Sequence, residues 1–227
     1  MRISIIEFPG SYGAAEALHS FKTVLGLDAR IIDHGAQGLE QPEVVILPGG
    51  AAYGDFLRPG CLAKVSPIAM PLRRFAREGG RIFGFGNGFQ ILCEMGLLPG
   101  AFLPNQGLSR FIGNASLKSA ASVYAGGASK LASDLTFKLP VSASHAAYYV
   151  SSRALQELKE DKMIVLQYTN KHGEVDPKQA FLGSVESIAG VCNKQGNILG
   201  LIPQPERAVE EIMGSLEGKR FLDLALS

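Results

Sequence analysis

The chain has 227 residues, of which 46% are hydrophobic and 19% are charged, and its formal net charge at pH 7 is +1. This composition is typical of a globular protein in water, and the length fits one large α/β domain or two small ones. The near balance of charges argues against nucleic acids and membrane surfaces as partners, because proteins that bind them usually carry clustered Lys and Arg in excess.

Cysteine usage and the first residues of the chain indicate the compartment. Cys61, Cys93 and Cys192 are an odd number, lie far apart and form no CxxC pair, which predicts a reducing cytoplasm. The apolar segment at residues 3–6 is too short for a signal peptide, and no apolar run approaches the ~18 residues of a membrane-spanning helix. The four histidines are scattered along the chain, so no metal site is expected.

Short apolar segments alternate with longer amphipathic segments in the first half of the chain. We expect strands at residues 3–8, 29–33, 44–47 and 81–85, and helices at residues 14–25, 66–78 and 89–95. This alternation predicts an α/β fold, a single open, mostly parallel twisted sheet with helices on both faces. Ligands of such sheets bind at the carboxyl ends of the strands, so functional residues are expected there.

The second half of the chain gives weaker signals. Residues 114–134, rich in Ala, Ser and Gly around Gly126 and Gly127, fit either a flexible loop or two short strands joined by a turn. Later segments predict strands at 163–168, 189–191 and 198–202, a hairpin turn at 193–197 and an amphipathic helix at 209–226. No repeat or long linker divides the chain, which predicts a single domain over residues 1–227.

Three glycines at alternate positions follow the strand predicted at residues 81–85. Gly84, Gly86 and Gly88 have the spacing of a nucleophile elbow, in which the flanking glycines let strand and helix approach closely. The tip of an elbow presents a Ser or Cys nucleophile, but Gly86 has no side chain. Spacing alone equally allows a Gly-rich turn that holds an anion at a helix N-terminus.

Four further stretches accompany this elbow, at residues 8–11, 47–60, 96–100 and 188–208. With them the chain resembles a class I glutamine amidotransferase, most closely the amidotransferase subunit of phosphoribosylformylglycinamidine synthase. The resemblance implies a flavodoxin-like fold and a part in the ATP-dependent amidation of formylglycinamide ribonucleotide in purine biosynthesis. It also implies a synthetase subunit as partner, with a small accessory subunit as a further candidate. ATP and Mg²⁺ would be bound by the synthetase, so no cofactor is expected in this chain.

The family hydrolyses glutamine with a Cys–His–Glu triad, and the resemblance places its three members at Gly86, Gln204 and Glu206. Only the glutamate is retained. Gly86 has no atom that could form a thioester, and a glutamine side chain cannot exchange a proton near neutral pH. Both the nucleophile and the proton carrier are therefore predicted to be missing.

Other parts of the family's site are partly kept. The resemblance assigns the amides of Gly50 and Asn87 to the oxyanion hole and places Gln90 beside the glutamine pocket. Tyr12 and the residues that follow it, and the stretch at 141–148, depart from the family pattern. These departures put contacts with glutamine and with the partner in doubt.

The sequence favours a subunit that keeps the fold and docks on a synthetase without hydrolysing glutamine. Two alternatives stay open, a repurposed ligand-binding or regulatory module and a glutaminase with another nucleophile. The three cysteines are better interpreted as buried structural residues. His145 is interpreted as a loop histidine rather than a base, and Glu206 as either a relic of the triad or an ion-pair partner of Arg207.

Overall fold

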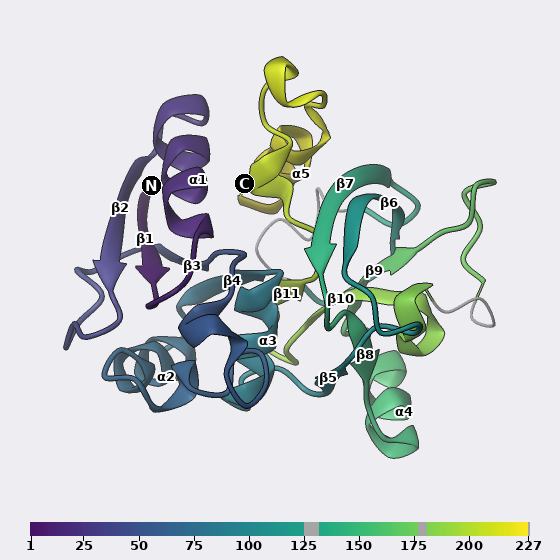
Figure 1. Cartoon of the computed structure of the whole chain (residues 1–227), viewed down its shortest axis with the longest axis horizontal. Coiled ribbons are helices and arrows are strands. Elements are labelled where there is room, and N and C mark those ends of the chain that lie inside the picture. Colours follow the sequence, from purple (N-terminus) through teal and green to yellow (C-terminus); the bar gives the residue numbers. More distant parts are fainter. Residues whose placement is uncertain (125–131, 177–180, 227) are drawn as a thin grey trace.

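The computed structural model describes residues 1–124, 132–176 and 181–226. Its main feature is a nine-stranded sheet with the order β2-β1-β3-β4-β11-β10-β9-β6-β7 (Figure 1). The strands of this sheet are β1 (Arg2–Glu7), β2 (Asp28–Asp33), β3 (Val44–Leu47), β4 (Arg81–Phe85), β6 (Phe111–Ser119), β7 (Thr136–Ala143), β9 (Ile164–Tyr168), β10 (Ile188–Cys192) and β11 (Ile198–Leu201). A separate two-stranded sheet pairs β5 (Ala101–Leu103) with β8 (Ala147–Tyr149).

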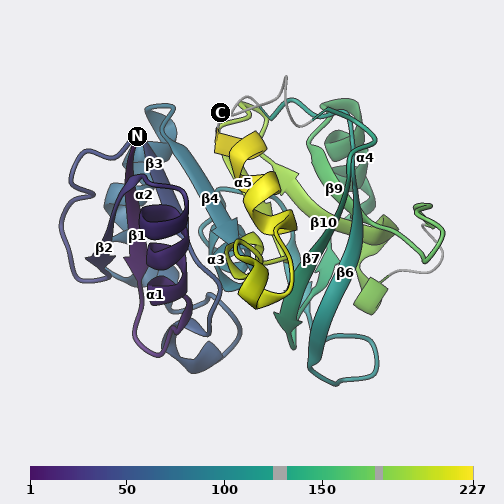
Figure 2. The ribbon, with the colours of Figure 1, turned by 90° about the horizontal axis from the view of Figure 1, so that it is seen from above.

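Helices lie on both faces of the sheet, as predicted. They are α1 (Gly13–Leu18), which continues as a π-helical turn (His19–Val24), α2 (Ala69–Arg77), α3 (Asn87–Glu94), α4 (Ser152–Glu160) and α5 (Glu217–Leu226). Figure 2 shows α1 and α5 on one side of the sheet and α2 and α3 on the other. Short 3₁₀ turns occur at Ala52–Asp55, Ala63–Val65, Phe181–Gly183, Val185–Ser187, Pro205–Arg207 and Glu211–Met213. None of the helices in the described ranges is long and apolar enough to cross a membrane.

The sheet has a parallel part and an antiparallel part. The strands β2, β1, β3, β4 and β11 are all paired in parallel, and the pairings from β11 through β10, β9 and β6 to β7 are antiparallel. The residues of β3 are fully buried, which is typical of a parallel strand covered by helices on both faces. The prediction of an open α/β sheet is confirmed.

The prediction for the C-terminal helix is wrong in extent. Only Glu217–Leu226 is helical, and the segment before it forms the 3₁₀ turn Glu211–Met213 inside a bridge between Glu210 and Ser215. Gly214 follows this turn with a φ of 86°, a left-handed conformation that ends helical structure. The helix predicted at residues 14–25 is also altered, because its second half is π-helical.

The poorly predicted middle of the chain holds regular structure. The strands β6 and β7 form a long antiparallel pair, and β8 and α4 follow. Of the segment 114–134, residues 114–119 belong to β6, whereas Gly126 and Gly127 lie outside the described residues.

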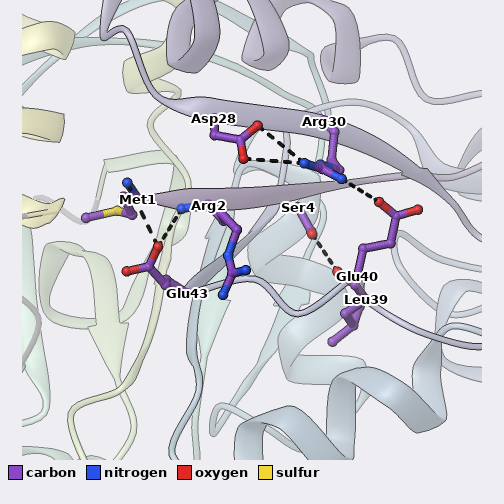
Figure 3. Close-up of polar contacts among 8 residues, drawn as sticks. All are labelled: Met1, Arg2, Ser4, Asp28, Arg30, Leu39, Glu40 and Glu43. Carbon is purple, nitrogen blue, oxygen red and sulfur yellow. Dashed lines mark hydrogen bonds and ion pairs between the residues drawn. The ribbon is translucent and has the colours of Figure 1, made fainter.

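Charged residues lie along the edge strand β2 and at the start of β1 (Figure 3). Arg30 pairs with Asp28 at 3.3 Å and with Glu40 at 3.1 Å, and the Arg2 amide donates to the Glu43 carboxylate at 2.7 Å. Such exposed pairs add little stability, but charges along an edge strand discourage pairing with another chain.

Candidate active site

Gly86 forms a sharp turn between β4 and α3. Its φ of 51° and ψ of −111° are unfavourable for residues with a side chain. The two glycines that flank it leave no room for a side chain. A Cβ atom at Gly84 would lie 2.7 Å from the Gly88 carbonyl carbon, and a Cβ atom at Gly88 would lie 1.9 Å from the Leu47 carbonyl oxygen. The turn therefore has the close strand–helix contact of an elbow, at the carboxyl edge of the parallel strands.

The side chain of Gln204 faces the tip of this turn. The three heavy atoms nearest to an ideal Cβ on Gly86 all belong to Gln204, and Nε2 is the closest at 2.9 Å. Gln204 is 1% exposed, and its backbone amide donates to the Pro140 oxygen of β7 at 2.8 Å. Within the described structure its Oε1 has no hydrogen-bond donor. A buried carboxamide thus occupies the space in front of the tip.

Glu206 is buried beside Gln204. Its Oε1 accepts from the Gly49 amide at 3.3 Å, whereas Oε2 has no hydrogen-bond partner among the described residues. Burial raises the pKa of this carboxyl to about 7. An ideal Cβ on Gly49 would lie 2.0 Å from Gln204 Nε2 and 3.3 Å from Glu206 Oε1. Both side chains therefore pack on the same glycine.

Arg207 is not the ion-pair partner of Glu206. Its guanidinium pairs with Glu16 of α1 at 2.7 Å. The backbone oxygen of Glu206 accepts instead from the Ser20 hydroxyl at 2.7 Å. These contacts attach the Pro205–Arg207 turn to α1 and to the π-helical turn after it.

Side-chain amides connect the elbow to neighbouring loops. Asn87 accepts from the Ala52 amide at 2.9 Å and donates to Gln90 at 2.9 Å and to Asp55 at 3.1 Å. Gln90 in turn donates to the backbone oxygen of His145 at 2.6 Å. These hydrogen bonds hold together the loop after β3, the first turn of α3 and the loop after β7.

Gly50 lies next to this network, in the loop that follows β3. An ideal Cβ on Gly50 would lie 2.3 Å from the Ser11 hydroxyl oxygen, so the loop after β1 also reaches the site. The structure therefore brings together around the elbow all six residues that the resemblance assigned to the site, which are Gly50, Gly86, Asn87, Gln90, Gln204 and Glu206.

A rim of polar residues surrounds these loops, and at its centre is Arg110, which the sequence did not identify. The Arg110 guanidinium donates to the Tyr12 hydroxyl at 3.0 Å and to the Ser142 hydroxyl at 2.9 Å, and Arg207 lies 5.5 Å from the Tyr12 ring centre. Asp55 is half-buried. Burial raises the pKa of its carboxyl, although the electrostatic interactions with His145 and Arg110 act to lower it. No local motif joins these residues in sequence.

The cysteines do not face the tip. Cys93 lies in α3 and donates to the Pro99 oxygen, and burial raises the pKa of its thiol well above the ordinary value. Burial also raises the pKa of Cys192, at the end of β10, to about 12, and Cys61 is buried in a loop. Since the thiolate is the nucleophile, buried thiols of raised pKa are poor candidates for catalysis.

His145 is a half-buried loop residue whose Nδ1 lies 3.1 Å from the Ser144 hydroxyl oxygen. Two other histidines make hydrogen bonds elsewhere, His19 with the Glu210 carboxylate and His34 with the Tyr53 hydroxyl. The interpretation of His145 as a loop histidine agrees with this placement.

Comparison with known proteins identifies the family. The model of the CobB/CobQ-like glutamine amidotransferase domain matches residues 1–221. The chain belongs to this family. It is 39% identical to the phosphoribosylformylglycinamidine synthase subunit PurQ of Wolinella succinogenes over 98% of each chain. It is 38% identical to the protein of the same name from Aquifex aeolicus, over 96% of each.

A solved structure gives the same result. A chain in the structure of PurLQS from Thermotoga maritima superposes with a TM-score of 0.83 at 32% identity, covering 99% of this chain and 97% of its own length. The amidotransferase fold is therefore present over nearly the full length, including the elbow and the loops around it.

Proposed function

We propose that this amidotransferase is a subunit of phosphoribosylformylglycinamidine synthase that does not hydrolyse glutamine. Its relatives carry the name of that subunit, and one of them is solved together with the other components in PurLQS. The partner would be the synthetase subunit, with a small accessory subunit as a further component. Nitrogen would then reach the synthetase as ammonia from solution.

The observation that carries the loss of hydrolysis is the contact between Gly86 and Gln204. At the position of the nucleophile there is no atom to attack an amide, and the side chain that faces it has no titratable proton near neutral pH. Glu206 would be the remaining triad member. The amides of Gly50 and Asn87 and the side chain of Gln90 would surround a site that no longer hydrolyses glutamine.

The activity of the complex tests this proposal directly. The purified chain is mixed with the synthetase subunit from the same source, and formation of formylglycinamidine ribonucleotide is measured with glutamine or with ammonium as nitrogen donor. We expect synthesis from ammonium only, at a rate that the chain increases. Synthesis from glutamine would mean that another residue performs the hydrolysis, and no effect with either donor would indicate a repurposed binding module.

A pair of substitutions tests whether only the chemistry is missing. Gly86→Cys with Gln204→His restores two triad positions beside Glu206, and both are changed because hydrolysis needs a nucleophile and a proton carrier. We expect glutamate release above that of the parent chain. The matched control is Gly86→Ala with Gln204→His, which lacks the nucleophile, and glutamine binding is measured in parallel to detect an altered pocket.

A further inference from the structure

A hollow on the antiparallel part of the sheet is lined by residues with hydrogen-bond donors. It has a volume of about 420 Å³ and is lined by β6, β7, the turn after β9 and the start of α5. None of the candidate active-site residues lines it. Its size falls within the ~300–1,000 Å³ of small-molecule sites in proteins.

Three cations line this hollow. The side-chain ammonium groups of Lys138 in β7 and of Lys171 in the turn after β9 have no hydrogen-bond or ion-pair partner in the ranges that the structure describes. Arg220 of α5 is the third cation, and it contacts the Glu217 carboxylate at 3.2 Å. Three cations against one carboxylate leave the lining with a net charge of +2.

Hydroxyl groups lie among these cations. Ser116, Thr136 and Thr169 are among the residues that line the hollow, and their hydroxyls have no protein partner among the described residues. Ser116 stands opposite Lys138 in the β6–β7 register, and the Thr169 amide donates to the Ser116 oxygen at 2.9 Å. The unpartnered donors therefore come from adjacent strands and share one surface.

The backbone around the hollow is already ordered. Arg220 donates to the Thr136 oxygen at 3.2 Å and lies 5.0 Å from the Phe137 ring centre. The turn that carries Lys171 is closed by Asn170, whose side-chain oxygen accepts from the His172 amide at 2.8 Å and the Glu174 amide at 3.1 Å. An ordered backbone reduces the conformational entropy that is lost when the side chains it carries bind a ligand.

We propose that this hollow binds a small phosphorylated metabolite through its phosphate group. A phosphate ester presents three acceptor oxygens and close to two negative charges, which matches a lining with two free ammonium groups and three free hydroxyls. The donors come from segments far apart in the chain, so they form no basic run in the sequence. This site is independent of the amidotransferase reaction and of its degenerate triad.

Calorimetric titration of the full chain at low salt tests the site, with inorganic phosphate and ribose 5-phosphate as separate probes. We expect millimolar or tighter binding of ribose 5-phosphate, weakened roughly fivefold or more by Lys138→Gln and by Lys171→Gln. Glu217→Gln is expected to strengthen binding, because it removes the one carboxylate of the lining. The matched control is Lys22→Gln, which removes an exposed lysine elsewhere and should leave the affinity unchanged.

The outcomes separate the sources of the anion. Equal affinity for both probes would support a site that recognises the phosphate group alone, and tighter binding of ribose 5-phosphate would support a sugar phosphate. The proposal is overturned if neither probe binds at ~10 mM, or if Lys22→Gln weakens binding as much as the lining variants. Binding of an acidic peptide without binding of either phosphate would also overturn it, in favour of a protein partner.

Discussion

The glycines of the elbow differ in what a side chain would meet. At Gly88 an ideal Cβ would lie 1.9 Å from the Leu47 oxygen, and at Gly84 it would lie 2.7 Å from the Gly88 carbonyl, both fixed backbone atoms. At Gly86 it meets only the end of the Gln204 side chain, at 2.9 Å. The flanking glycines are therefore required because a side chain would collide with fixed backbone, whereas glycine at the tip is favoured by its left-handed backbone conformation.

The largest expected effect is that of Gly88→Ala. The new methyl group would collide with backbone that belongs to the central strand β3, which has no room to move within the sheet. We expect the free energy of unfolding to fall by about 3 kcal/mol or more, measured by urea denaturation.

Gly38→Ala is the matched control for that measurement. Gly38 has no atom within 4 Å of an ideal Cβ and no left-handed φ, so the same substitution should change stability by less than about 1 kcal/mol. Equal effects at Gly38 and Gly88 would show that the close contact at the elbow does not limit the residue at 88.

Glu206 provides a test that depends on pH. Burial raises the pKa of its carboxyl to about 7, so between pH ~4.5 and ~7 the folded protein keeps a proton that the unfolded chain releases. The free energy of unfolding should therefore decrease as pH rises through this window, and the ionised carboxylate should cost about 3 kcal/mol at pH 8. Glu206→Gln removes the titration and should flatten the profile while it keeps an acceptor for the Gly49 amide.

The control for Glu206 is Glu7→Gln, which removes an exposed carboxylate at the end of β1. Chemical denaturation at several pH values should give the parent profile for this variant. A Glu206→Gln protein whose stability still falls between pH 5 and 8 as in the parent would show that the slope has another origin.

The parallel part of the fold was predictable because its strands are short apolar runs that end at Gly or Pro. The strand β7 was not predicted, although its residues alternate regularly between exposed and buried. Pro140 interrupts the pattern, since proline usually argues against a strand. It is tolerated here because β7 is the edge of the sheet, a property that only the tertiary structure defines.

The same distinction applies to the site. Gly86 and its flanking glycines are close in sequence, so their spacing alone suggested an elbow, and the resemblance to the family added Gln204 and Glu206. The contacts of Arg110 with Tyr12 and Ser142 join three distant segments through hydroxyl groups of ordinary residue types. Local patterns carry no signal for such contacts, because they arise only when the sheet brings its loops together.

The smallest expected effect isolates the contact between the tip and Gln204. Gly86→Ala should cost about 1–3 kcal/mol of stability through backbone strain, because φ is 51° there. If the end of Gln204 adds to that cost, Gly86→Ala should destabilise a Gln204→Ala protein less than it destabilises the parent, by about 0.5–1 kcal/mol. A double-mutant cycle by urea denaturation measures this difference. Additive effects would mean that the buried carboxamide moves aside freely, and that the residue at 204 does not constrain the one at 86.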